Sequence, residues 1–353
     1  MKRKLSSLML VGLVVLAACG SDDSTEPTSS AAPGTQPGTE TTAPTAEAVE
    51  LTVALPVGIC LATWPFHVAI NEGLFAAEGL DVTVEGLDGS SAAIQATLAG
   101  RADMAVTAPA DMLAASGEGA DVIGWYSVYQ YLPFNVVTLA DSGITDLAQL
   151  EGKTIGISSP AGGDAIFMRS LLSQAGVAAG SYEELSVGEG EAAATALTSG
   201  AVDAYSASFV EELVFGGMGI EFIQLKSDTY PAVAGLVIMS DTSWYESNPD
   251  VAAGLGRALA QATKWGLADR AGIERVCTEV APEETKDPGF ATVVLDAVDP
   301  LFTPLESAAG KHGYVDEAQF AAYRDLLVEL EVVEPAAAET QVSNVHLDAW
   351  NEG

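Results

Sequence analysis

The chain has 353 residues, of which 49 are Asp or Glu and 14 are Lys or Arg, so its formal net charge is -35 at pH 7. This acidic balance argues against a nucleic-acid partner and against adhesion to anionic lipid, because both carry charge of the same sign. The length suits two domains of ordinary size behind an N-terminal segment, and no later run of about 18 apolar residues predicts a membrane span.

The N-terminus has the pattern of an export signal. Residues 2–4 are basic, and residues 8–18 form an apolar run too short to span a bilayer. Residues 16–20 read Leu-Ala-Ala-Cys-Gly, which resembles a bacterial lipobox. We therefore expect residues 1–18 to be a lipoprotein signal peptide and Cys19 to carry lipid, which would anchor the protein to the membrane on the extracytoplasmic side of the cell envelope. An ordinary secretory signal that contains a cysteine is the alternative.

Residues 19–48 are expected to form a linker. After Cys19 they consist almost entirely of Ser, Thr, Pro, Gly, Ala and acidic residues. Such a composition cannot bury enough apolar surface to offset the entropy of ordering, so the segment predicts a disordered tether. A flexible chain of this length spans about 30 Å root-mean-square.

The following residues alternate strand and helix patterns. Strands are predicted over 51–55, 81–84 and 104–107, and helices over 66–77 and 91–98. This order is typical of a parallel sheet with right-handed crossovers, whose ligand crevice lies beyond the carboxyl ends of the strands.

The same unit recurs in the middle of the chain. A strand is predicted over 153–157 and helices over 164–174 and 191–199. Residues 100–103 (Gly-Arg-Ala-Asp) and 200–203 (Gly-Ala-Val-Asp) each stand between an Ala-rich helix and a strand. Two similar α/β units explain this echo, and chance similarity of Ala-rich helices is the alternative.

Two apolar segments are placed to connect two lobes. The chain is expected to cross between lobes near residues 135–140 and to return over 234–239. The first lobe would then hold residues 49–140, the second 141–233, and the stretch 234–353 would return to the first lobe. Helices predicted over 249–268 and 316–330 would pack back on the first lobe.

Several segments together resemble a known family of binding proteins. They are residues 65–82, 99–103, 141–147 and 151–156, whose order and spacing are similar to those of ABC-importer solute-binding proteins for nitrate, sulfonates, taurine and thiamine-pyrimidine precursors. The resemblance covers residues 51–237. It implies an α/β, two-lobed periplasmic-binding-protein fold of type II with two hinge crossings, a small-molecule ligand between the lobes, and an ABC-transporter permease as partner. We expect a monomer without a cofactor.

An enzymatic function is disfavoured by missing parts. The family includes a fungal pyrimidine synthase with a cysteine-rich iron-binding motif, and this chain has no such cluster. A hydrolase would need a Gly-x-Ser-x-Gly elbow, which is absent, and the three histidines, His67, His312 and His346, are scattered. We expect no catalytic residues and no transition-metal site.

Two loops have the composition of a ligand-binding edge. Strand-to-helix loops present backbone N–H groups and positive helix ends, and their glycines allow close approach of a ligand. The candidate residues are Ser90, Ser91, Ser158, Ser159, Gly162, Gly163 and Asp164. Helix N-capping is the alternative role for Ser91 and Asp164.

Aromatic residues are candidates for the cleft walls. They are Trp64, Phe66, Trp125, Tyr126 and Tyr205. Flat rings from both lobes would suit a flat ligand, and we expect Trp64 and Tyr126 in particular to stack on it. Core packing is the alternative for each ring.

The candidate loops carry no Lys or Arg, although sulfonate and nitrate are usually held partly by such residues. The pattern therefore favours a flat nitrogen heterocycle similar to a thiamine-pyrimidine precursor, whose amines would meet Asp111 or Asp164. An alkanesulfonate, taurine or nitrate ligand is the alternative, because helix N-termini alone can hold an oxyanion. An N-cap is the other reading of Asp111.

Two cysteines remain after Cys19, namely Cys60 and Cys277. In an oxidising compartment they could form a disulfide, or they could be two small buried thiols. The sequence leaves this choice open.

Overall fold

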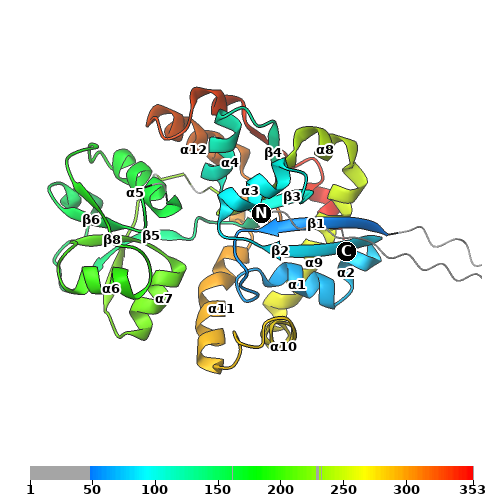
Figure 1. Cartoon of the computed structure of the whole chain (residues 1–353), viewed down its shortest axis with the longest axis horizontal. Coiled ribbons are helices and arrows are strands. Elements are labelled where there is room, and N and C mark those ends of the chain that lie inside the picture. Colours follow the sequence, from blue (N-terminus) through cyan, green and yellow to red (C-terminus); the bar gives the residue numbers. More distant parts are fainter. Residues whose placement is uncertain (1–47, 161, 228–229, 232, 353) are drawn as a thin grey trace, which may run out of the picture. The chain divides into compact units, whose positions relative to one another are not determined.

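The computed structural model describes residues 48–160, 162–227, 230–231 and 233–352. Cys19 and nearly all of the expected signal and linker lie outside these residues. The described part contains two β-sheets, each with helices on both faces (Figure 1). This arrangement confirms the two-lobed α/β fold.

The first lobe is built on a six-stranded sheet in the order β11-β4-β10-β3-β1-β2. Strands β1, β2 and β3 are parallel, as expected, whereas β10 runs antiparallel to both β3 and β4. The strands are β1 (Val49–Leu55), β2 (Leu80–Gly86), β3 (Met104–Thr107), β4 (Val122–Tyr129), β10 (Leu236–Asp241) and β11 (Gln341–Val342).

The second lobe is built on a five-stranded sheet in the order β7-β6-β8-β5-β9. Strands β6, β7 and β8 are parallel, and β5 is antiparallel to β8 and β9. The strands are β5 (Phe134–Leu139), β6 (Thr154–Ile157), β7 (Glu183–Ser186), β8 (Ala204–Ser208) and β9 (Phe222–Leu225).

The second lobe carries three α-helices, with α5 on one face of its sheet and α6 and α7 on the other (Figure 1). They are α5 (Gly163–Gln174), α6 (Glu191–Thr198) and α7 (Phe209–Gly217), with the 3-10 turn η1 (Leu147–Leu150) before β6. The first lobe holds α1 (Trp64–Asn71), α2 (Leu74–Ala77), α3 (Ser90–Leu98), α4 (Pro109–Gly117), α8 (Thr242–Ser247), α9 (Pro249–Ala268), α10 (Arg270–Val280), α11 (Pro288–Phe302), α12 (Glu317–Glu329), α13 (Leu347–Trp350) and the 3-10 turns η2 (Glu306–Ala308) and η3 (Pro335–Glu339).

The internal echo of the sequence has the same geometry in both lobes. In the first lobe the Asp103 carboxylate accepts a hydrogen bond from the Thr52 backbone N–H at 2.7 Å. In the second, Asp203 accepts one from the Thr154 N–H at 3.0 Å. Each aspartate thus fastens the turn after a helix to the neighbouring parallel strand, so the echo reflects two equivalent α/β units.

The first crossing lies earlier than the sequence suggested. Residues 134–139, which we assigned to the end of the first lobe, form β5 and pair with β8 and β9 in the second sheet. The apolar pattern of β5 could not distinguish a connecting segment from a strand of the second lobe. The return is placed as expected, because β10 pairs with β3 and β4.

The helix predicted over residues 66–77 is divided into α1 and α2. Gly73 between them has φ of 70°, a left-handed conformation that favours glycine and interrupts a right-handed helix. The apolar periodicity continues across the break because both pieces pack on the same core, so the pattern alone did not reveal it.

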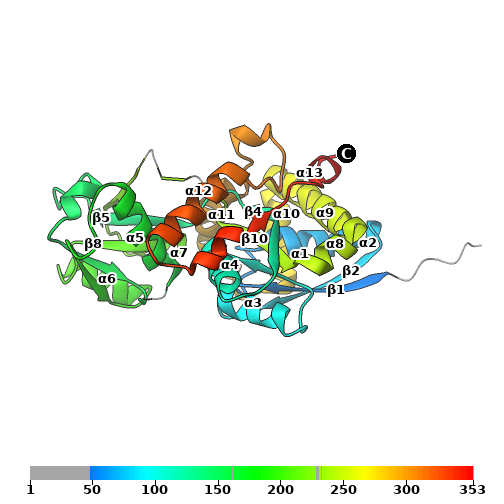
Figure 2. The same cartoon turned by 90° about the horizontal axis from the view of Figure 1, so that it is seen from above.

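The C-terminal segments pack back on the first lobe, as predicted. In both views α12 lies beside α4 (Figure 1 and Figure 2), and η3 contacts both helices. The predicted helix over 316–330 is α12. Within the described residues, no helix is both long and apolar enough to cross a bilayer.

Candidate functional site: the cleft between the lobes

The candidate site is formed by loops that follow the carboxyl ends of parallel strands in both sheets. In the first lobe these loops precede α1, α3 and α4, and in the second lobe they precede α5, α6 and α7. The two edges meet, because Phe209 and Leu213 of α7 pack against the core of the first lobe. Such edges bind ligands in open α/β folds.

The loop before α1 is fixed in place by several bonds. Cys60 forms a disulfide with Cys277 of α10. The Glu284 carboxylate accepts hydrogen bonds from the backbone N–H groups of Cys60 and Leu61 at 2.9 and 3.0 Å. The Tyr129 hydroxyl donates to the Ala62 carbonyl oxygen at 2.6 Å. This loop is therefore a rigid wall of the cleft.

The loop before α5 is held together by hydrogen bonds to the carboxylate of Asp164. Asp164 accepts hydrogen bonds from the Ser158 N–H at 2.7 Å and from the Ser158 Oγ at 2.5 Å. A Cβ atom at Gly162 would lie 2.2 Å from Asp164 Oδ1, so only glycine fits beside this contact. Asp164 is buried and holds the loop together, while Ser159 is exposed. The structure thus gives Asp164 a role in the loop itself.

The loop before α7 repeats this arrangement. Glu211 accepts hydrogen bonds from the Ser208 N–H at 3.0 Å and from the Ser208 Oγ at 2.5 Å, and only 6% of Glu211 is exposed. Sequence reasoning missed this pair. Its signal was available, because Ser-x-x-Glu at the start of an apolar run is a capping box.

A group of carboxylates from both lobes acts on one side chain. The pKa of Glu189, in the loop before α6, is raised by burial and then by the charges of Glu211, Asp164 and Asp88. Asp88 belongs to the first lobe, in the loop before α3. Glu189 therefore lies within electrostatic range of both edges of the cleft, and it was also missed from the sequence.

The candidate residues Ser90 and Ser91 connect the start of α3 with the start of α4. Ser90 Oγ accepts a hydrogen bond from the Ala108 N–H at 3.0 Å, and Ser91 Oγ donates to Asp111 Oδ1 at 3.0 Å. Burial raises the pKa of Asp111. Ser91 and Asp111 line a cavity of about 510 Å³ between α3 and α4, formed by the first lobe alone. The expectation that Asp111 meets a ligand in the cleft is not supported by this placement.

The aromatic candidates lie in the cores of the lobes. Trp64 and Phe66 are fully buried, and the Trp64 ring centroid is 4.8 Å from that of Phe302. Trp125 stacks on Tyr245 with centroids 5.6 Å apart.

Tyr126 and Tyr205 are enclosed in the same way. Tyr126 meets Trp350 edge-on at 5.2 Å and is 3% exposed, and the buried Tyr205 donates its hydroxyl to the Gly188 carbonyl oxygen at 2.8 Å. Our expectation that Trp64 and Tyr126 stack on a ligand is corrected, because neither ring is accessible. Their apolar positions on α1 and β4 face the core.

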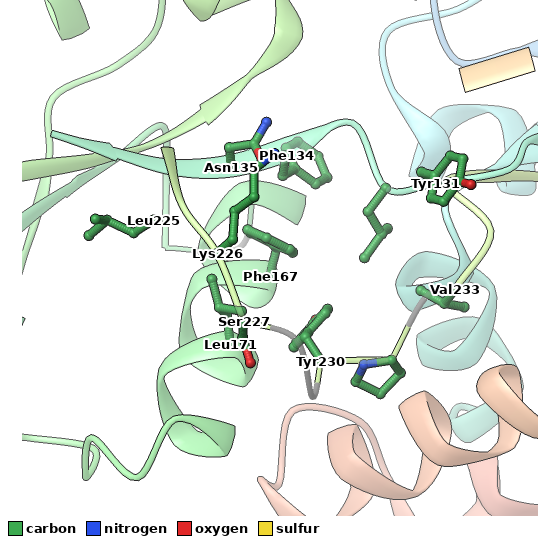
Figure 3. Close-up of a pocket in the computed structure, with 12 residues that line it drawn as sticks. Tyr131, Phe134, Asn135, Phe167, Leu171, Leu225, Lys226, Ser227, Tyr230 and Val233 are labelled. Atoms are coloured by element: carbon green, nitrogen blue, oxygen red, sulfur yellow. The ribbon is translucent and has the colours of Figure 1, made fainter. Parts of the chain in front are cut away.

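Other rings surround a cavity of about 340 Å³ at the two crossings. Figure 3 shows Phe134, Phe167 and Tyr230 near one another, with Tyr131 across the cavity. The Phe167 ring lies 6.0 Å from Phe134 and 5.3 Å from Tyr230. A Cβ at Gly163 would come within 3.2 Å of Phe134, so the Phe134 ring packs on the first turn of α5. The sequence signal of the cavity was weak, because these residues are far apart in the chain.

A third cavity of about 330 Å³ lies between α7 and α11 and also contacts the loop before α1. Its lining comes from both lobes and is apolar except for Asp287. No group of three or more His, Cys, Asp or Glu side chains that could hold a metal ion occurs among the residues that the structure describes.

Comparison with known proteins gives consistent relatives. The family model described as NMT1/THI5 like matches residues 62–271. A formylaminopyrimidine-binding protein of Halalkalibacterium halodurans is 26% identical over 204 residues, which cover 56% of this chain and 61% of that relative.

Solved structures agree with the fold. The alkanesulfonate-binding protein of Xanthomonas axonopodis pv. citri bound to MOPS superposes with a TM-score of 0.62 at 16% identity, covering 85% of this chain and all of that one. The periplasmic nitrate-binding protein of Synechocystis PCC 6803 gives 0.58 at 13% identity, covering 86% and 88%. These likenesses show a periplasmic-binding-protein fold.

Proposed function

Because this chain belongs to the NMT1/THI5-like family, we propose that it is the extracytoplasmic solute-binding component of an ABC importer. It would capture a small solute between its lobes and deliver it to the permease. The fold supports this role, since α7 of the second lobe packs on the first-lobe core beside strand-to-helix loops of both sheets. We also retain the proposal that Cys19 carries a lipid anchor and that residues 19–48 are a tether.

The ligand that the cleft favours is a small heterocycle with amino groups. The observation that supports this proposal is the placement of two carboxylates in the second-lobe loops, where Ser158 holds Asp164 and Ser208 holds Glu211. The charges of both carboxylates also raise the pKa of Glu189. The loops at residues 56–63, 86–91, 158–164 and 187–190 contain no Lys, Arg or His. Amine donors facing carboxylates form charge-assisted hydrogen bonds, whereas an anion would be repelled.

The relative from Halalkalibacterium halodurans supports the same class, since it is named for binding a formylaminopyrimidine. In our proposal the exposed Ser159 and the backbone around Gly162 and Gly163 contact the solute, together with Ser90 and the Glu189 carboxylate. Ser158 and Asp164 shape the loop.

An alkanesulfonate or a related anion is the second candidate. It is favoured by the N-terminus of α5, whose first N–H groups follow Gly162 and can hold an oxyanion. The two ligand candidates differ in charge: the amino heterocycle offers N–H donors to the Glu189 carboxylate, whereas the alkanesulfonate is negatively charged.

Calorimetric titration with a 4-aminopyrimidine, taurine and nitrate separates these candidates. We expect the aminopyrimidine to bind and to raise the melting temperature, because a ligand of the native state stabilises it. Tight binding of taurine with no binding of aminopyrimidine would reject the heterocycle and keep the solute-binding role. For the anchor, Cys19→Ser should move the protein from the membrane to the soluble fraction, and a variant that stays membrane-bound would reject lipidation.

A further inference from the structure

The apolar cavity between α7 and α11 borders two of the loops of the proposed binding cleft, those before α1 and α7. One wall belongs to the second lobe and begins at Phe209, directly after the Ser208 that Glu211 holds. The facing walls belong to the first lobe and include Ile59, in the loop that the disulfide fixes, and Phe290 of α11. The cavity therefore begins beside the loop before α7.

Apolar side chains are unusually exposed around this cavity. Ile59, Val210, Phe290 and Val293 are 37%, 40%, 49% and 44% exposed, although all four contribute to its lining. Apolar groups gathered at one place on a soluble protein mark a surface that another apolar group covers. Here the cavity of about 330 Å³ is large enough for part of a small molecule.

We infer that this cavity, which we call the apolar groove, receives an apolar substituent of the transported solute. The inference rests on the proposed function and narrows its ligand to an amphipathic compound. The amino heterocycle lies at the Glu189 carboxylate, and an alkyl or aryl group extends between α7 and α11. The occupant is the solute because the groove is walled by both lobes and borders the loops before α1 and α7, which belong to the proposed binding cleft.

Three 4-aminopyrimidines that carry a methyl, butyl or hexyl group at carbon 5 test this inference by calorimetric titration. Each methylene that enters the groove should raise affinity about three- to fourfold, following the transfer free energy of a buried CH₂ group. The double variant Val210→Ser with Val293→Ser should reduce this gain, weakening the hexyl compound about tenfold and the methyl compound by less than threefold.

Val280→Ser is the matched control, since Val280 of α10 is 51% exposed and does not line the groove. It should leave all three affinities unchanged. Equal affinities for the three compounds in the wild type would overturn the groove while keeping the proposed function. If none of the three binds, both the groove and the amino-heterocycle ligand are rejected. If the double variant weakens all three equally, the groove serves contact between the lobes or with the permease, and the inference is overturned.

Discussion

The two lobes prepare their sides of the cleft in different ways. In the first lobe the loop before α1 is held by the disulfide of Cys60 and by Glu284, and it presents apolar groups such as Ile59. In the second lobe the loops close on Asp164 and Glu211 through serine hydrogen bonds, and they leave Glu189 exposed. The first lobe therefore supplies a fixed shape, and the second supplies most of the carboxylate charge.

Removing the ring that supports the first-lobe wall should have the largest effect. Trp64 is fully buried against Phe302, so Trp64→Ala should lower the free energy of unfolding by about 3 to 5 kcal/mol. Urea unfolding followed by circular dichroism measures this change. Tyr131→Ala is the control, since that ring is 42% exposed and should cost less than about 0.5 kcal/mol. If Trp64→Ala leaves the unfolding free energy unchanged but weakens ligand binding, Trp64 contacts the ligand and its assignment to the core is wrong.

Releasing the first-lobe loop should be the next largest effect. The disulfide joins residues 217 positions apart, so Cys60→Ser with Cys277→Ser should lower the free energy of unfolding by about 2 to 5 kcal/mol. Denaturant unfolding of this variant and of the oxidised wild type gives the difference. Identical midpoints for the two proteins would show that the loop does not depend on the bond.

Loosening the second-lobe loop should cost less. Ser158→Ala removes one hydrogen bond to the Asp164 carboxylate but keeps the backbone one, so we expect a loss of about 1 to 2 kcal/mol of stability. The neighbouring Ser159→Ala is the control, because Ser159 is exposed and its loss should leave the unfolding midpoint unchanged. Equal effects of the two substitutions would argue against a special role for the Ser158–Asp164 contact.

The sequence predicted the regular parts of the fold better than the site. The predicted strands β1, β2, β3 and β6, the predicted helices such as α3, α5 and α9, and the echo at Asp103 and Asp203 follow from local patterns that the structure confirms. The prediction of ligand-stacking rings was wrong for a physical reason. An aromatic residue near a strand end shows the same sequence pattern whether it lies in a core or in a cleft, and Trp64 and Tyr126 lie in the core.

The remaining features depend on contacts between distant segments. Cys60 and Cys277 meet only after α10 packs on the loop before α1, so their pairing could not be read from spacing. Glu189 became a candidate only when Asp88 was placed near it by the fold. The crossing was misplaced because β5 joins a sheet whose other strands come later in the chain.

Titration of a 4-aminopyrimidine into the wild type and into Glu189→Gln tests most directly whether the second lobe supplies the selecting charge. Removing this carboxylate should weaken binding roughly two- to fivefold, the range for a partly exposed charge, and should weaken it less at low pH, where the raised pKa already favours the neutral form. Glu151→Gln, an exposed carboxylate of the same lobe outside these loops, should bind like the wild type. Unchanged or tighter binding by Glu189→Gln would contradict the account.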